Sequence, residues 1–182
     1  GGGHVKRCLA LANEFRKHGI NSIFICQELP GLDKSLFTKS QHKYYFIPSS
    51  PDHIIDANNS SKIILDKNLG ITTVIVDHYQ INFKWEEIIS RMVEKLIVID
   101  DLAISKHSCD LIINQVHGIV DSDYDDCVSK PCKLLLGSKY LMLKQEFSEV
   151  REKIKPISFK KNIQHVHVCF GLNDKNGFTI RF

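Results

Sequence analysis

Three glycines run directly into a histidine at the start of the chain, and an amphipathic helical pattern follows without a spacer. Glycine has no Cβ, so Gly2 and Gly3 can bring the backbone close to a ligand. The free N–H groups and positive dipole end of the helix would attract a phosphate or carboxylate. The same dipole disfavours a charged imidazole at His4, which we expect to be neutral and able to take a proton from water. These residues predict a ligand loop with a general base; the alternative is an ordinary turn in which His4 is an exposed cap.

Polar residues follow three apolar segments, at 71–76, 96–99 and 111–113, that we predict to be buried strands. The polar residues are Asp77, His78, Tyr79, Asp100, Asp101, Asn114 and Gln115. In open parallel sheets, ligands gather at the carboxyl ends of the strands. These positions are therefore candidate substrate contacts, and the alternative for each is a strand-end cap or turn residue.

Strands alternate with helices along the chain, which predicts a parallel sheet with helices on both sides. A helical period runs over 5–18, and Gly19 is expected to cap that helix. Further helices are predicted at 30–40, 84–94 and 145–155, and one that ends at Gly70 follows a polar stretch at 48–62. The remaining predicted strands are 20–26, 44–47 and 166–170.

The last predicted helix is halted by Pro156, and the polar segment 158–164 is typical of a linker. We expect residues 1–156 to form one Rossmann-like domain, and residues 157–182 to be a linker and the beginning of a second domain. A glycine loop of this kind normally follows a strand. We therefore also expect the first strand, and most of the second domain, to be missing from this sequence.

Composition excludes several classes of protein. A net charge of +3, without an arginine-rich tract, argues against nucleic-acid binding. No apolar run is long enough to span a membrane, and no signal segment opens the chain, so a cytoplasmic protein is expected. The six cysteines do not suggest a disulfide framework in a chain of 182 residues. Neither Cys127 with Cys132, nor the alternating His165, His167 and Cys169, completes a metal-binding pattern, and no metal is expected.

Residues 1–9, Gly-Gly-Gly-His-Val-Lys-Arg-Cys-Leu, resemble the Gly-x-Gly-His-x-x-Arg-Cys signature of the PseG-type UDP-sugar hydrolases of pseudaminic acid biosynthesis. These enzymes are related to the MurG-like glycosyltransferases. Further matching segments occur in the family's order and together cover nearly the whole chain. They are residues 76–79 with 85–86, 99–103, 109–111 with 114–115, and 137–140 with 146–147.

The resemblance implies a GT-B fold, in which two Rossmann-like domains face each other across a cleft and this chain supplies the N-terminal half. The reaction it implies removes UDP from a UDP-linked 2,4-diacetamido-2,4,6-trideoxy hexose, without a metal or other cofactor. His4 takes the position of the family's catalytic base. The substrate contacts expected on this sequence are Gly2, Gly3, Arg7, Asp77, His78, Tyr79, Asn114, Gln115, Tyr140 and Glu146.

In the second domain, the resemblance implies that the nucleotide is bound at Gly171, Asn173 and Asp174. Here the sequence departs from the family, because Leu172 stands where a second glycine is usual. Lys144 and Gln145 likewise replace a usual Arg-Pro pair. Two alternative functions remain open at this point: a glycosyltransferase of the same fold that passes a UDP-linked amino sugar to an acceptor, and a sugar-binding fragment without catalytic activity.

Overall fold

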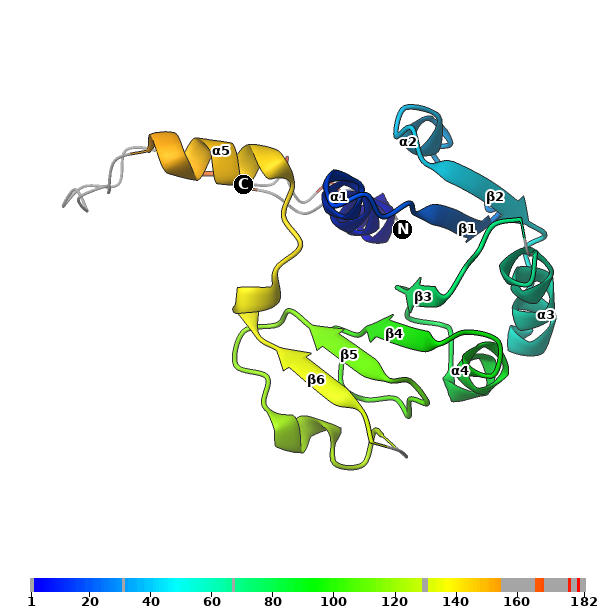
Figure 1. The fold of residues 1–182 in the computed structure, drawn as a ribbon. Coiled ribbons are helices and arrows are strands. Elements are labelled where there is room, and N and C mark those ends of the chain that lie inside the picture. Colours follow the sequence, from blue (N-terminus) through cyan, green and yellow to red (C-terminus); the bar gives the residue numbers. More distant parts are fainter. Residues whose placement is uncertain are drawn as a thin grey trace.

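The computed structural model describes residues 2–30, 32–66, 68–128, 131–154, 166–168, 177 and 180. Parallel strands are flanked by helices, so the predicted α/β class is confirmed, although no α-helix separates the strands among the described residues between 95 and 136 (Figure 1). The helices are α1 (Gly2–Lys17), α2 (Ser35–Thr38), α3 (His53–Ile64), α4 (Phe83–Ser90) and α5 (Gln145–Lys153), with 3-10 turns at Asp121–Tyr124 and Ser138–Tyr140.

The described strands form two parallel sheets where the sequence predicted one. A two-stranded sheet pairs β1 (Ile23–Gln27) with β2 (Lys43–Ile47). The four-stranded sheet has the order β3 (Thr73–Val76), β4 (Lys95–Ile99), β5 (Leu111–Asn114) and β6 (Lys133–Leu136). Helix α3 contacts both β2 and α4, and thereby links the two sheets.

The core lies between one face of the four-stranded sheet and the helices α3 and α4. Leu96 and Ile112 of the sheet are fully buried, as are Ala57 of α3 and Ile89 of α4. Each fully buried large aliphatic side chain contributes about 1.5–3 kcal/mol relative to an exposed one. This packing holds the sheet against α3 and α4, while the parallel pairing of β3, β4 and β5 aligns their carboxyl ends.

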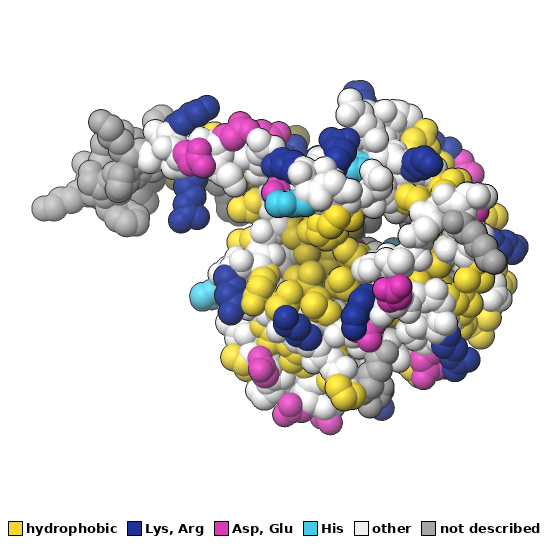
Figure 2. Space-filling view, in the orientation of Figure 1, with side chains coloured by type: hydrophobic (Ala, Val, Ile, Leu, Met, Phe, Trp, Pro, Cys, Tyr) yellow, Lys and Arg dark blue, Asp and Glu magenta, His cyan; other side chains and the backbone are white. Residues whose placement is uncertain are grey.

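The opposite face of the same sheet is only partly buried. Alternation along the strands places Ile75, Ile97 and Ile113 on this face, and each is of intermediate exposure. Figure 2 shows hydrophobic side chains gathered in a hollow below α1. Helix α1 reaches the carboxyl ends of β3 and β4 through side-chain hydrogen bonds and leaves apolar surface beside it.

Several predicted boundaries are wrong, and the largest error concerns α3. The stretch 48–62 was expected to be irregular because it is polar, yet α3 occupies most of it. Asp52 caps the helix, since its carboxylate accepts hydrogen bonds from the N–H groups of Ile54 and Ile55. Ser61 is buried on the inner face, where its hydroxyl donates to the carbonyl of Ala57 at 2.6 Å. A polar residue that bonds its own helix can thus lie in the core.

Smaller differences occur elsewhere. Helix α1 begins at Gly2, so Gly2 and Gly3 lie in its first turn rather than in a preceding loop. The helix predicted at 30–40 is only the short α2, β6 was not predicted, and residues 166–168 have no strand assignment. The predicted cap at Gly19 is confirmed by its positive φ of 76°, a conformation that glycine adopts readily.

Candidate functional site

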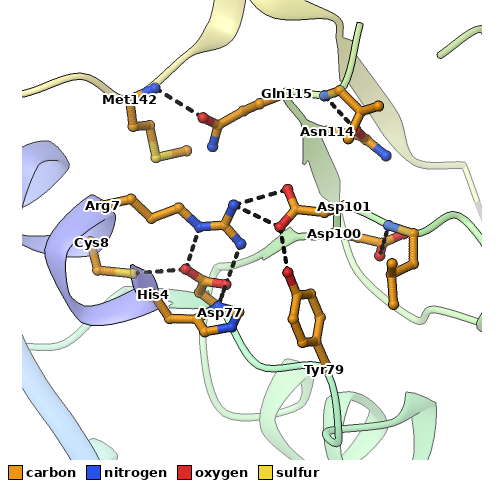
Figure 3. A network of polar contacts seen from close by, with 12 residues as sticks. His4, Arg7, Cys8, Asp77, Tyr79, Asp100, Asp101, Asn114, Gln115 and Met142 are labelled. Atoms are coloured by element: carbon orange, nitrogen blue, oxygen red, sulfur yellow. Dashed lines mark hydrogen bonds and ion pairs between the residues drawn. The ribbon is translucent and has the colours of Figure 1, made fainter. Parts of the chain in front are cut away.

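Side chains from α1 and from the carboxyl ends of β3 and β4 meet in one group, which we call the His4 cluster: His4, Arg7, Asp77, Tyr79 and Asp101 (Figure 3). His4 and Arg7 are three residues apart on α1, and this spacing puts them on the same helix face. Asp77 and Tyr79 follow β3, and Asp101 follows β4. The structure thus brings three of the predicted strand-end residues together, and their contact with substrate stays a prediction.

Arg7 holds two carboxylates at once. Its Nε and Nη2 donate to the two oxygens of Asp77, each at 2.6 Å, in the bidentate arrangement that suits a guanidinium. Its Nη1 reaches Asp101 Oδ2 at 2.8 Å. The Asp77 side chain is only 2% exposed. Burial alone would raise the pKa of Asp77, but the hydrogen bonds from Arg7 and His4 lower it. Asp77 is therefore an ionised acceptor at neutral pH.

His4 is oriented by this carboxylate. Its Nδ1 lies 2.5 Å from Asp77 Oδ1. Because ionised Asp77 can only accept, Nδ1 carries the proton and Nε2 of a neutral ring is left as an acceptor. The His4 side chain is 20% exposed, so the ring has access to solvent. A histidine held in one tautomer by a buried carboxylate is the arrangement of a general base.

Tyr79 limits the position of the histidine ring from the other side. Its ring meets that of His4 edge-on, with 4.6 Å between centroids. Its hydroxyl donates to Asp101 Oδ2 at 3.1 Å. Arg7 and Tyr79 thus share Asp101, and the cluster is one connected network rather than separate pairs.

Cys8 also lies against this network, because its sulfhydryl contacts Asp77 Oδ2 at 3.5 Å. Burial raises the pKa of the Cys8 thiol strongly, and the neighbouring Asp77 carboxylate adds to the effect. A thiol in this state is a poor nucleophile, since the thiolate is the reactive form. Cys8 thus packs as a small side chain against Asp77.

Asn114 and Gln115 were predicted to contact substrate, and each already has a partner within the protein. Asn114 is fully buried, and its amide donates to the Tyr124 hydroxyl at 2.9 Å. The side-chain oxygen of Gln115 accepts from the backbone N–H of Met142 at 3.0 Å (Figure 3). Neither is hydrogen-bonded to the His4 cluster among the described residues, and their contact with substrate stays a prediction.

The other predicted contacts, His78, Tyr140 and Glu146, are not members of the His4 cluster. His78 follows Asp77 directly, and its Nδ1 accepts from the backbone N–H of Gln80 at 3.1 Å. Tyr140 lies in a 3-10 turn, with the Lys139 ammonium 5.0 Å from its ring centroid. Glu146 is exposed in the first turn of α5. Gly171, Asn173 and Asp174 were also predicted, and they lie outside the described residues.

A cavity that the sequence did not indicate has His78, the residue after Asp77, in its wall. Its volume is about 350 Å³, and its wall includes Gln27 at the end of β1, His53 at the start of α3, and Gln80. Gln27 ends a strand, so the rule that drew attention to Asp77 could also have found it. No comparable signal marked His53, because α3 itself was not predicted to begin there.

A second polar network lies buried under the same sheet edge. His107 Nδ1 is 2.8 Å from Glu86 Oε1, and its Nε2 is 3.5 Å from Asp100 Oδ2. Asp100 also accepts from the Tyr124 hydroxyl at 2.9 Å. Burial alone would raise the pKa of Asp100, but these neighbours and the backbone N–H of Leu102 lower it to about 2. The network therefore contains two buried carboxylates around one histidine.

The free energy of unfolding is expected to fall as the pH rises from 6.5 to about 9. Burial alone would lower the pKa of His107, but the Asp100 and Glu86 carboxylates raise it to about 9 from an ordinary 6.5. A pKa that is raised by folding stabilises the protein fully below the unfolded value, and this effect is lost as the pH passes the folded value. The loss is on the order of 3 kcal/mol. Melting temperatures measured across this pH range should decline in the wild type and change less in His107→Gln. An equal decline in both proteins would contradict the role of His107.

The described residues contain no group of three or more His, Cys, Asp or Glu side chains placed to hold a metal ion. Within the same residues, every helix is too short or too polar to cross a membrane.

Comparison with known proteins links the chain to a nucleotide-sugar enzyme. No protein-family model matches it. Over 157 residues, or 84% of the chain, it is 29% identical to the UDP-2,4-diacetamido-2,4,6-trideoxy-beta-L-altropyranose hydrolase of Campylobacter jejuni, and the match covers 52% of that protein. Over its whole length it is 28% identical to an uncharacterized protein of Methanocaldococcus jannaschii, of which 36% is covered. The chain thus spans about half the length, or less, of these relatives, and the predicted resemblance to the PseG-type hydrolases is confirmed.

Proposed function

Because the chain is a PseG-like protein, we propose that the protein which contains it hydrolyses a UDP-linked 2,4-diacetamido-2,4,6-trideoxy hexose, with His4 as the general base. The observation that carries this proposal is the pair formed by His4 and Asp77, at 2.5 Å. It presents an acceptor nitrogen on a ring that remains partly open to solvent. The relative from Campylobacter jejuni is a hydrolase of such a UDP-sugar, which supports the same reaction here.

In the proposed reaction, His4 Nε2 takes a proton from a water molecule as the water oxygen bonds to the anomeric carbon. The bond between that carbon and the UDP oxygen breaks, and its electron pair leaves with UDP. Negative charge on UDP is spread over the diphosphate, so the leaving group needs no strong general acid. Asp77 keeps His4 in the required tautomer and stabilises the imidazolium that forms.

Arg7 has a positioning role in this proposal. It holds Asp77 and Asp101 through four hydrogen bonds and ion pairs of 2.6–2.9 Å, and Asp77 in turn orients His4. Its guanidinium is already engaged with two carboxylates, so it is less suited to bind the diphosphate. We propose that the nucleotide is held mainly by a second domain, which begins in residues 157–182, whereas residues 1–156 form the sugar-side domain.

Product analysis tests the proposed reaction. The intact protein that carries this chain should release both UDP and free sugar from the UDP-sugar when no acceptor is present. Proton NMR of the first product formed should show inversion at the anomeric carbon, because water attacks from the face opposite UDP. Release of UDP that requires an added acceptor would instead identify a glycosyltransferase, and retained configuration would contradict direct attack by water.

A further inference from the structure

The cavity beside the His4 cluster has no role in the reaction described above. It has a volume of about 350 Å³ and lies where the carboxyl ends of β1 and β3 approach the start of α3. His78 and Gln80 form part of its wall, and His78 directly follows Asp77, the residue that orients His4. A ligand group that contacts His78 in this cavity would therefore lie one residue along the chain from the carboxylate that orients His4.

The charge of the cavity wall argues against a phosphate. No Lys or Arg is found among the described residues that line it. The carboxylate of Asp56 is part of the wall, but it already accepts hydrogen bonds from Trp85 Nε1 and Gln27 Nε2, both at 2.6 Å. A diphosphate would have no cation to pair with and would face this carboxylate. The cavity is thus better matched to an uncharged polar group.

Two side chains of the wall can make hydrogen bonds to such a group. His78 Nδ1 accepts from the N–H of Gln80, which leaves the proton on Nε2. Burial lowers the pKa of His78 below its ordinary value, so His78 is a neutral donor at pH 7. The side-chain amide of Gln80 has no hydrogen-bond partner among the described residues. It offers both a donor and an acceptor.

The size of the cavity matches one sugar ring. Pockets for small ligands span about 300–1,000 Å³, and this one lies at the lower end of that range. A whole nucleotide sugar would exceed it. Ile81 and Pro51 add apolar wall, which suits the methyl groups and carbon faces of a deoxy, acetylated sugar.

We propose that this cavity is the sugar pocket of the nucleotide-sugar site, and that Gln80 sets the preference for sugars with acetamido groups by hydrogen bonding to one of them. This inference rests on the proposed function, and it names the part of the substrate that each region holds. Gln80 is a specificity residue here, while His78 donates to a sugar oxygen.

Gln80→Leu provides the test, because leucine keeps much of the side-chain volume and removes both hydrogen-bonding groups. In the intact protein we expect KM for the UDP-diacetamido sugar to rise about tenfold, whereas inhibition by UDP alone is unchanged. The matched control is Asn58→Leu, which replaces an exposed amide on α3 outside the cavity wall. The control should leave both quantities unchanged.

Two outcomes would overturn the inference. If inhibition by UDP weakens as much as KM rises, the cavity holds the nucleotide. If Gln80→Leu behaves like the Asn58→Leu control, the cavity lies outside the substrate site.

A protein that lacks turnover would refute the proposed function, and a separate measurement then decides the inference. Saturation-transfer NMR with UDP-N-acetylglucosamine should show transfer to the acetamido methyl in the wild type. That signal should be reduced in Gln80→Leu and retained in Asn58→Leu. Absence of transfer to the methyl group in the wild type would refute the sugar pocket independently of any catalysis.

Discussion

Replacing His4 with alanine is expected to lower kcat for UDP release by roughly 100- to 10,000-fold, which is the usual contribution of a general base. The substitution removes the partly exposed ring whose Nε2 is placed to accept a proton from water. KM should change much less, because the sugar and nucleotide contacts remain. Steady-state kinetics of UDP release by the intact protein measure both quantities.

The matched control for this experiment is His18→Ala. His18 lies just beyond the end of α1, its side chain is 71% exposed, and its ring lies 3.6 Å from Glu14. This variant should keep wild-type kinetics. Circular dichroism should show that both variants are folded. Near-wild-type UDP release by a folded His4→Ala protein would falsify the role of His4 as the base.

Replacing Arg7 with methionine is expected to cost the most stability of any single change in the cluster. Methionine keeps much of the apolar stem but leaves the Asp77 carboxylate, which is 2% exposed, without its cation. Removal of one partner from a buried ion pair costs about 3–5 kcal/mol. The lower end applies here because Arg7 is 18% exposed. Chemical denaturation at neutral pH measures this loss.

The pH dependence distinguishes this cause from a general packing defect. The lowered pKa of Asp77 contributes stability that is present above its ordinary value of 3.8 and is lost as the pH falls through the lowered value. Without Arg7 this contribution should largely vanish. The difference in the free energy of unfolding between the wild type and Arg7→Met should therefore become smaller in acid. Arg16→Met, an exposed change on the same helix, should cost little at any pH. If the loss of unfolding free energy in Arg7→Met is the same at every pH, its cause is lost packing instead.

The free energy of unfolding of Arg7→Lys should lie between that of the wild type and that of Arg7→Met. Lysine keeps the charge but cannot bond both oxygens of Asp77 and reach Asp101 at the same time. We expect partial stability and a reduced kcat, because Asp77 would then orient His4 less firmly.

The local chemistry of the site could be read from the sequence. The three-residue spacing of His4 and Arg7 indicated one helix face, and Asp77 after an apolar segment indicated the carboxyl end of a buried strand. The alternation of helices and strands predicted parallel pairing, and Gly19 was predicted as a cap. These features depend on near neighbours in the chain, and helical and strand periods report them directly.

Only the tertiary structure decided which of these residues meet. Asp77 is 73 residues from His4. No local sequence pattern predicts that its carboxylate accepts hydrogen bonds from both His4 and Arg7. The same holds for Asn114: its type suggested a ligand contact, which stays a prediction, and only packing shows that it is buried and donates to Tyr124. The cavity at Gln80 depends likewise on α3, which begins about ten residues before its predicted start. Burial and long-range hydrogen bonds are set by which elements pack together, so a residue's type and spacing define what it can do, and its partners define what it does.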